Sequence, residues 1–266
     1  MTTPPGTALE VGARVHFTAL PGIPLVQAGD ALGPLIEDAL TRAELQLEPG
    51  DVLVVTSKLF SRSEGRFVDM STVVPSEEAR ALALEVDKDP AQVELILRES
   101  VGVSRKRPGV LVVRHRLGFI SANAAIDMSN ASPAHAAPGT GPWALLLPED
   151  PDKSARDLLA ALGVPGVGLV VSDSFGRPFR VGTVGVAVGV AGVPAVFDQR
   201  GRLDLHGREL QYTITALADQ LAAAADLVAG QSDEARPVIH IRGLRFVAAD
   251  SHVRELLRDP EVDLYA

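Results

Sequence analysis

The stretch Val167-Gly-Leu-Val-Val171, followed by Ser172-Asp-Ser-Phe-Gly-Arg-Pro-Phe-Arg180, determines both the expected fold and the expected site. Its apolar first half has the length and valine content of a buried strand. We expect that strand to end at Val171, because a polar cluster follows at once. Carboxylate and hydroxyl oxygens suit hard cations and guanidiniums suit phosphates, so the cluster predicts a phosphate-handling site. Its candidate side chains are Ser172, Asp173, Ser174, Arg177 and Arg180.

Short apolar runs alternate with helical patterns on both sides of this stretch. Strands are predicted at 15–17, 51–55, 110–113, 167–171 and 237–241. Helices are predicted at 30–45 with Asp30 as N-cap, from 76, from 89, at 150–163 and at 219–229. This alternation indicates a mixed α/β (α+β) protein, although the order is not the regular repeat of a Rossmann fold.

Glycine and proline mark further features along the chain. Glycines at 182, 185, 189 and 192 suit close backbone packing in a strand. The segment 132–142 is rich in alanine, proline and glycine and is predicted to be a mobile loop. We expect residues 1–14 to be a flexible leader, 15–250 to form one domain of two interleaved lobes, and 251–266 to be a C-terminal tail.

The composition narrows the class of protein. The 266 residues are 46% hydrophobic and 22% charged, which is typical of a globular protein. A net charge of −9 argues against nucleic-acid binding, and the absence of cysteine excludes disulfides and thiolate metal sites. No apolar run approaches the roughly 18–20 residues of a membrane span, and no signal peptide is evident. We therefore expect a cytoplasmic protein that acts on small molecules, with no membrane or nucleic-acid partner.

Common nucleotide-binding and acyl-enzyme motifs are absent. The chain has no G-x-x-x-x-G-K-[ST] sequence and no G-x-G-x-x-G between a strand and a helix. Four polar clusters remain that could bind a phosphate or a cation, and each has a structural alternative. Thr56-Ser57-Lys58 could be a solvated strand end, and Asp127-Met-Ser-Asn130 could be an Asx turn. Asp204-Leu-His-Gly-Arg-Glu-Leu-Gln211 could be a polar turn before a helix, and Leu20-Pro-Gly-Ile-Pro-Leu-Val26 could be a rigid loop.

Together these clusters resemble one known family, the coenzyme F420-0:L-glutamate ligases. The resemblance runs in order from about residue 17 to residue 243. It is carried by Ile23-Pro-Leu-Val26, Val54-Val-Thr-Ser-Lys58, Arg62-Ser-Glu-Gly65, Arg116-Leu-Gly118, Ala122-Asn-Ala-Ala-Ile-Asp-Met-Ser-Asn130, Leu147-Pro-Glu-Asp-Pro-Asp152, Ser172-Asp-Ser-Phe-Gly-Arg177, Gly182-Thr183 and Gly207-Arg-Glu-Leu210.

The resemblance implies a reaction and its requirements. Members of the family add L-glutamate to the lactyl carboxylate of F420-0, consume GTP and need divalent cations, and some add further γ-linked glutamates. For this chain it implies GTP as co-substrate, Mg²⁺ or Mn²⁺, and K⁺ as a further cation. It also implies an F420-ligase-like fold over 15–250 and an intertwined homodimer with the site near the subunit contact.

The resemblance also assigns roles to individual residues. The metal ligands are expected to be Asp127, Asp173, Ser174 and Glu209. The GTP-binding residues are expected to be Ile23, Pro24, Leu25, Val26, Ser57, Arg62, Asn130, Gly207 and Gln211. Catalysis is assigned to Asp173, and on chemical grounds alone Arg177 and Arg180 are expected to hold phosphate or a substrate carboxylate. Arg62, Ala125 and Val181 replace the usual lysine, glycine and asparagine, which leaves the number of glutamates added open.

Chemistry favours the ligase but leaves rivals. A carboxylate does not condense with an amine at neutral pH, because its hydroxyl is a poor leaving group, whereas an acyl phosphate formed from GTP reacts readily. The same carboxylates would also serve a metal-dependent nucleotide phosphohydrolase, a non-catalytic GTP-binding relative, or a ligase for another carboxylate. The length allows either a stand-alone ligase or a piece cut from a longer fusion.

Overall fold

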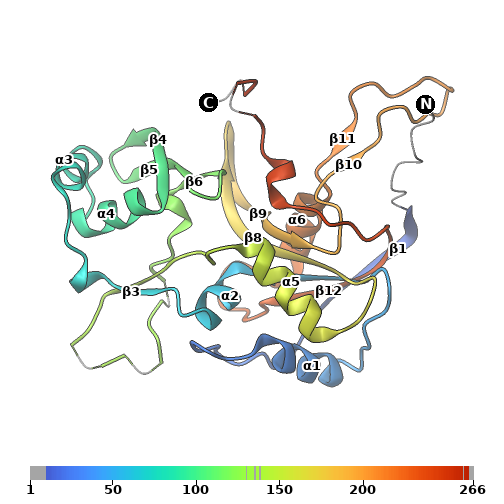
Figure 1. Ribbon diagram of the computed structural model, residues 1–266, viewed down its shortest axis with the longest axis horizontal. Helices are drawn as coiled ribbons and strands as arrows, with labels where there is room; N and C mark the ends of the chain where they lie inside the picture. The colour runs from blue at the N-terminus through green and yellow to red at the C-terminus, as the bar shows by residue number, and fades with distance from the viewer. Residues whose placement is uncertain (1–9, 130, 135, 138, 260, 264–266) are drawn as a thin grey trace.

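A five-stranded mixed sheet forms the centre of the molecule, in a computed structural model that describes residues 10–129, 131–134, 136–137, 139–259 and 261–263 (Figure 1). The strand order is β1-β12-β2-β8-β9. Only β2 and β8 run parallel, and the other neighbours are antiparallel. The strands are β1 (Glu10–Ala19), β2 (Val52–Thr56), β8 (Gly168–Arg177), β9 (Arg180–Ala191) and β12 (Val238–Arg245).

Helices cover both faces of this sheet, which is why residues 52–55 of β2 and 168–171 of β8 are apolar and buried. Leu53 and Val55 of β2 belong to a core with α1 (Leu32–Arg42), α2 (Ser57–Ser63) and α5 (Pro151–Leu162). Val52 and Val54 belong to the core that contains α6 (Leu217–Ala229). Successive strand residues point to opposite faces, so a segment covered on both sides favours apolar residues at every position.

Two glycines of β9 allow helices to approach the sheet closely. A Cβ at Gly185 would lie 2.5 Å from the carbonyl oxygen of Ala222 in α6. A Cβ at Gly189 would lie 2.6 Å from the carbonyl carbon of Pro151 in α5. The predicted close packing at these two glycines is thus confirmed.

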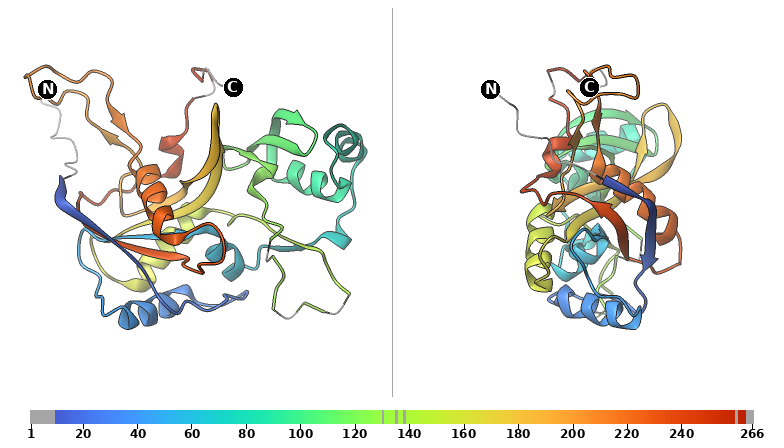
Figure 2. Two further views of the ribbon diagram at one scale, coloured as in Figure 1. Left: turned by 180° about the vertical axis from the view of Figure 1, so that it is seen from behind. Right: turned by 90° about the vertical axis from the view of Figure 1, so that its right-hand side faces the viewer.

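Two smaller parts extend from opposite ends of the long axis (Figures 1 and 2). One, which we call the small lobe, packs two helices on a three-stranded sheet. It contains α3 (Glu77–Val86), α4 (Pro90–Arg98), β4 (Ser100–Arg107), β5 (Val110–His115) and β6 (Ile120–Ala122). The other, which we call the arm, spans residues 197–215 and contains β10 (Phe197–Asp198) and β11 (Ile214–Thr215). The strands β3 (Phe67–Asp69) and β7 (Trp143–Leu145) connect the small lobe to the centre.

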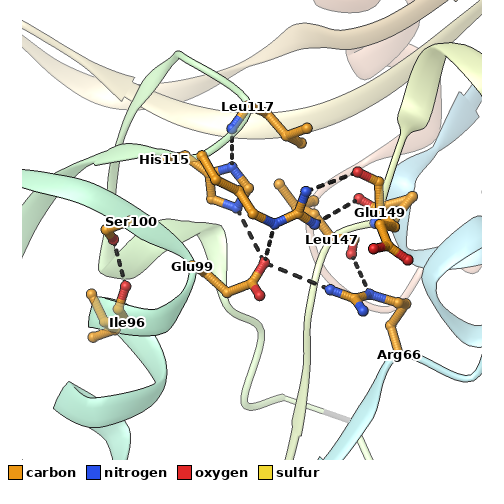
Figure 3. A network of polar contacts seen from close by, with 10 residues as sticks. Arg66, Ile96, Glu99, Ser100, His115, Leu117, Leu147 and Glu149 are labelled. Carbon is orange, nitrogen blue, oxygen red and sulfur yellow. Dashed lines mark hydrogen bonds and ion pairs between the residues drawn. The ribbon is translucent and has the colours of Figure 1, made fainter.

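A buried carboxylate, Glu99 at the end of α4, joins the small lobe to the centre (Figure 3). It accepts a hydrogen bond from Arg116 Nε at 3.0 Å and lies 3.6 Å from Arg66 Nη2. The same guanidiniums donate to the carbonyls of Leu147 and Glu149, just before α5. Burial opposes ionisation of Glu99, but His115 and the two arginines hold its pKa below the usual range. The junction is therefore ionic, with its charges compensated.

Most predicted elements are confirmed. Ser76 and Asp89 cap α3 and α4 through their side chains, and α5 runs from its Asp150 cap to Gly163 in the left-handed conformation. The described residues of 132–142 form no helix or strand. No helix in the described part of the chain is long and apolar enough to cross a membrane.

Several boundaries differ from the prediction. Strand β8 continues through the polar cluster to Arg177, because β9 pairs with it over this whole length. The carboxylate of Asp30 does not cap α1; it accepts instead from the backbone N–H of Gln27. Residues 10–14 belong to β1 rather than to a leader. Part of the expected tail is packed, since Val253 is buried and its N–H donates to Asp152.

Replacing Gly189 by alanine is expected to lower the free energy of unfolding by about 2–3 kcal/mol, because the added methyl group overpacks the contact with α5. Gly176→Ala is the matched control, since a Cβ on this neighbouring strand meets nothing within 4 Å. Urea denaturation of both variants measures the difference. Equal stability of the two variants would contradict the close packing described for Gly189.

Candidate functional site

A cavity of about 740 Å³ opens at the edge of the central sheet where β2 ends. One side is formed by the turn 23–26 and by the start of α2. The other sides come from residues 172–176 of β8, from β6 with the turn that follows it, and from the segment after α6. Several of the polar clusters singled out in the sequence therefore meet here.

The parallel pairing of β2 with β8 brings Ser57 and Asp173 together. In the register of this pair Thr56 lies opposite Ser172. The residues that follow them, Ser57 and Asp173, therefore reach the same edge of the sheet. The hydroxyl of Ser57 donates to Asp173 Oδ2 at 3.1 Å. These two residues are 116 positions apart in the sequence, and only the strand register makes them neighbours.

Asp173 lies in an environment that disfavours its charge. Burial raises its pKa to about 6, and the neighbouring carboxylate of Asp127 adds to this effect. Hydrogen bonds from Ser174 N–H, at 2.7 Å, and from Ser57 oppose the shift without cancelling it. No ion pair joins Asp173 to a described lysine, arginine or histidine. The site therefore holds an anion whose charge is incompletely compensated.

The environment of Asp127, in contrast, favours its charged form. Burial again disfavours its charge, but Lys58 and Ser129 hold its pKa below the usual range. Asp127 Oδ2 lies 2.5 Å from Lys58 Nζ. Its Oδ1 accepts from both the N–H and the hydroxyl of Ser129, each at 2.7 Å. Two carboxylates with pKa values moved apart are typical of functional sites.

Arg62 shapes the cavity through the backbone. It is buried and donates to the carbonyl of Val26 at 2.7 Å and to that of Ser132 at 3.3 Å. Its guanidinium also lies over the ring of Phe67, with the carbon 5.1 Å from the ring centroid. Arg62 therefore connects the turn 23–26 to the loop beyond Asp127. All four residues of that turn, Ile23, Pro24, Leu25 and Val26, line the cavity.

A short left-handed turn leads to Asp127. Asn123, Ala124 and Ala125 have φ values of 52°, 54° and 53°. This conformation favours glycine, and for alanine it is strained by contact of the Cβ with the backbone. The turn would therefore suit a glycine at position 125. It also places strained backbone within two residues of a candidate ligand.

One wall of the cavity, formed by residues 229–232 and 234–237, is not predicted from the sequence. The side chain of Gln231 donates to Ser174 Oγ at 2.7 Å. A signal for this wall existed: β12 runs antiparallel to β2, with Val238 opposite Val55, so residues just before β12 lie at the edge where β2 ends. The position of this wall follows only once the strand order of the sheet is known, and the sequence pattern does not provide that order.

Arg177 and Arg180 are not part of this cavity, contrary to the expectation from the sequence. They face each other across the turn of the β8–β9 hairpin. Because β8 stays extended, Arg177 lies four residues beyond Asp173, a distance of about 13 Å along the strand.

Gly207, Glu209 and Gln211 lie in the arm and do not line the cavity. Glu209 pairs there with Leu203 in an isolated β-bridge. Among the described residues, no three histidine, cysteine, aspartate or glutamate side chains gather into a metal site. The predicted set Asp127, Asp173 and Glu209 is therefore not assembled within one chain. Asn130 lies outside the described residues.

The residues that do meet fit a hard divalent cation in part. Asp127, Asp173 and Ser174 offer carboxylate and hydroxyl oxygens, the ligands that Mg²⁺ and Mn²⁺ prefer. The incompletely compensated charge of Asp173 is a further sign that a positive partner belongs here. The cavity can thus accept an anionic ligand, provided that a cation or local donors offset its charge.

Several proteins that are similar to this chain are named coenzyme F420:L-glutamate ligase. The protein of Methanopyrus kandleri is 42% identical over 248 residues, covering 90% of this chain and 93% of the relative. That of Methanothermobacter thermautotrophicus is 41% identical over 256 residues, covering 94% and 98%. That of Natronomonas pharaonis is 44% identical over 234 residues, covering 86% of each.

The model of one protein family, described as F420-0:gamma-glutamyl ligase, matches residues 22–243. The match includes every element that lines the cavity, from the turn 23–26 to the segment before β12. The chain therefore belongs to the F420-0:gamma-glutamyl ligase family.

Proposed function

We propose that this chain is a GTP- and divalent-cation-dependent ligase that joins L-glutamate to the lactyl carboxylate of coenzyme F420-0. The observation that carries the proposal is the pair Asp127 and Asp173, two carboxylates with opposed pKa shifts at the wall of one cavity in a member of this family. Relatives that share most of their length with this chain carry the corresponding name. Addition of further γ-linked glutamates would extend the same reaction.

The reaction we propose has two steps. A carboxylate oxygen of F420-0 attacks the γ-phosphorus of GTP, the bond to the β-phosphate oxygen breaks, and GDP leaves. The glutamate nitrogen then attacks the acyl carbon of the acyl phosphate, the carbon–oxygen bond breaks, phosphate leaves and the nitrogen loses a proton. A divalent cation, when bound, offsets charge on the phosphates during transfer.

The chain's own residues would divide this work between them. Ile23 to Val26, held by Arg62, form a rigid wall for the nucleotide, and Ser57 offers a hydroxyl beside Asp173. Asp127, Asp173 and Ser174 would hold Mg²⁺ or Mn²⁺. K⁺ as an accessory cation and Asn130 as a GTP ligand remain proposals from the family resemblance. Arg177 and Arg180 have no proposed contact with the substrates of their own chain.

A homodimer would complete the site. Glu209 lies on the arm, whose residues do not line the cavity, and the arm extends at the opposite end of the molecule from the small lobe (Figure 2). The arm carries apolar side chains that are almost fully exposed, among them Leu205 and Tyr212. Burial of such residues against a second copy would be favourable. We propose that the arm of one protomer brings Glu209, with Gly207 and Gln211, to the cavity of its partner.

The reaction is tested by incubation with F420-0, GTP, Mn²⁺ and L-glutamate, followed by mass analysis. A gain of one or more glutamates, with GDP release that depends on glutamate, supports the ligase. GDP release that ignores glutamate would instead indicate a phosphohydrolase, and nucleotide binding without turnover a regulator.

Asp173→Asn is expected to reduce glutamate ligation by at least about a thousandfold, since it removes a charged ligand from the centre of the site. The readout is the initial rate of product formation at saturating substrates. Asp157→Asn is a suitable control, because Asp157 is an exposed partner of Lys153 on α5. Turnover like that of the wild type in Asp173→Asn would reject the metal-site assignment.

The same variant is expected to be more stable than the wild type at pH 8, by about 1–2 kcal/mol. The folded-state pKa of about 6 lies above the usual aspartate pKa of 3.8, so ionised Asp173 costs folding free energy. That cost is complete above pH 6 and shrinks as the pH falls towards 4, where the two proteins should converge. Denaturation at both pH values gives the comparison, and a variant that is less stable at pH 8 would contradict the assigned environment of Asp173.

The dimer proposal predicts complementation between two inactive variants. Mixing Asp173→Asn with Glu209→Gln, after subunit exchange, is expected to restore about a quarter of the wild-type activity, because half the dimers are mixed and each contains one intact site. The separate variants, treated identically, are the controls. No recovery despite verified exchange would place Glu209 outside the partner's site.

A further inference from the structure

Lys58 occupies the position beside Asp127 where a cation would be needed. Its Nζ lies 2.5 Å from Asp127 Oδ2 and donates to the carbonyl of Ser129 at 3.4 Å. It stands in the first turn of α2, next to Ser57, and lines the cavity. About one third of the Lys58 side chain is exposed, so its four-carbon stem is free to turn.

The ammonium and a divalent cation compete for this position. Lys58 is the positive group paired with Asp127 Oδ2, while Oδ1 is occupied by the two donors from Ser129. A divalent cation bound to Asp127 would lie within a few ångströms of Nζ, where like charges repel strongly. Lys58 must then move. The cavity beside it is where the phosphate chain of the nucleotide is proposed to bind.

We propose that Lys58 is an exchangeable counterion: it neutralises Asp127 before the substrates bind, and it turns to the nucleotide phosphates when the divalent cation takes its place. The inference rests on the proposed function and adds a positioning role for a residue outside the ligand set above. Its consequence is coupling. The cation binds weakly while Lys58 has no other anion, and tightly once a phosphate chain receives the ammonium.

A permanent ion pair is the alternative, with Lys58 only fastening α2 to residues 127–129. The two roles predict opposite effects of neutralising the lysine. If Lys58 competes with the cation, neutralising it strengthens cation binding in the absence of nucleotide. If Lys58 only holds Asp127 in place, neutralising it makes Asp127 more mobile and weakens cation binding. The sign of the change therefore decides between them.

The experiment measures Mn²⁺ binding to the full chain by electron paramagnetic resonance of free Mn²⁺, with and without a non-hydrolysable GTP analogue. The variants are Lys58→Gln, Lys58→Met and the charge-preserving Lys58→Arg. Lys153→Gln is the matched control, because Lys153 Nζ also lies 2.5 Å from an aspartate oxygen, that of Asp157. Thermal unfolding followed by circular dichroism verifies that each variant is folded.

Without nucleotide, Lys58→Gln and Lys58→Met are expected to bind Mn²⁺ about tenfold more tightly than the wild type, while Lys58→Arg and Lys153→Gln remain close to it. With Mn²⁺ present, the two neutral variants should bind the GTP analogue about tenfold more weakly. Unchanged or weaker Mn²⁺ binding in both folded neutral variants would overturn the role of Lys58. A wild type that binds no Mn²⁺ even with the analogue would instead overturn the proposed metal site, and the role of Lys58 with it.

Discussion

The parallel register between β2 and β8 is the constraint from which the site follows. It places Thr56 opposite Ser172, and so brings the start of α2 and the polar half of β8 to one edge of the sheet. Both strands are buried on both faces, so the sheet cannot slip by one residue without moving apolar side chains out of their cores. The contact between Ser57 and Asp173 is thus fixed by core packing that involves neither residue.

The electrostatics of the site depend on this placement. Asp127 has Lys58 and Ser129 as partners, whereas Asp173 has hydrogen bonds but, among the described residues, no cationic neighbour at ion-pair distance. The pKa of Asp127 is therefore lowered, while burial raises that of Asp173 to about 6. A cation bound between the two carboxylates would stabilise their ionised forms. A purely structural role does not explain why a carboxylate without a described cationic partner is buried here.

The small lobe is connected to the same site by aromatic and ionic contacts. His115 stacks on Phe119 with ring centroids 4.8 Å apart, and Phe119 contacts Phe175, whose centroid is 5.0 Å away. Phe175 follows Ser174 directly in β8, while His115 lies beside Glu99 (Figure 3). A change in the position of the small lobe would therefore displace the residues next to Asp173.

The sequence by itself determined the elements, the mixed α/β class, the family and most of the residues that line the cavity, because apolar runs, caps and ordered motifs are local signals. It could not determine how far β8 extends, since only pairing with β9 keeps the polar residues extended and moves Arg177 away from Asp173. Nor could it show the wall around Gln231 or the separation of Glu209 from the cavity. Those facts depend on strand order and register, which are set by long-range packing between distant segments.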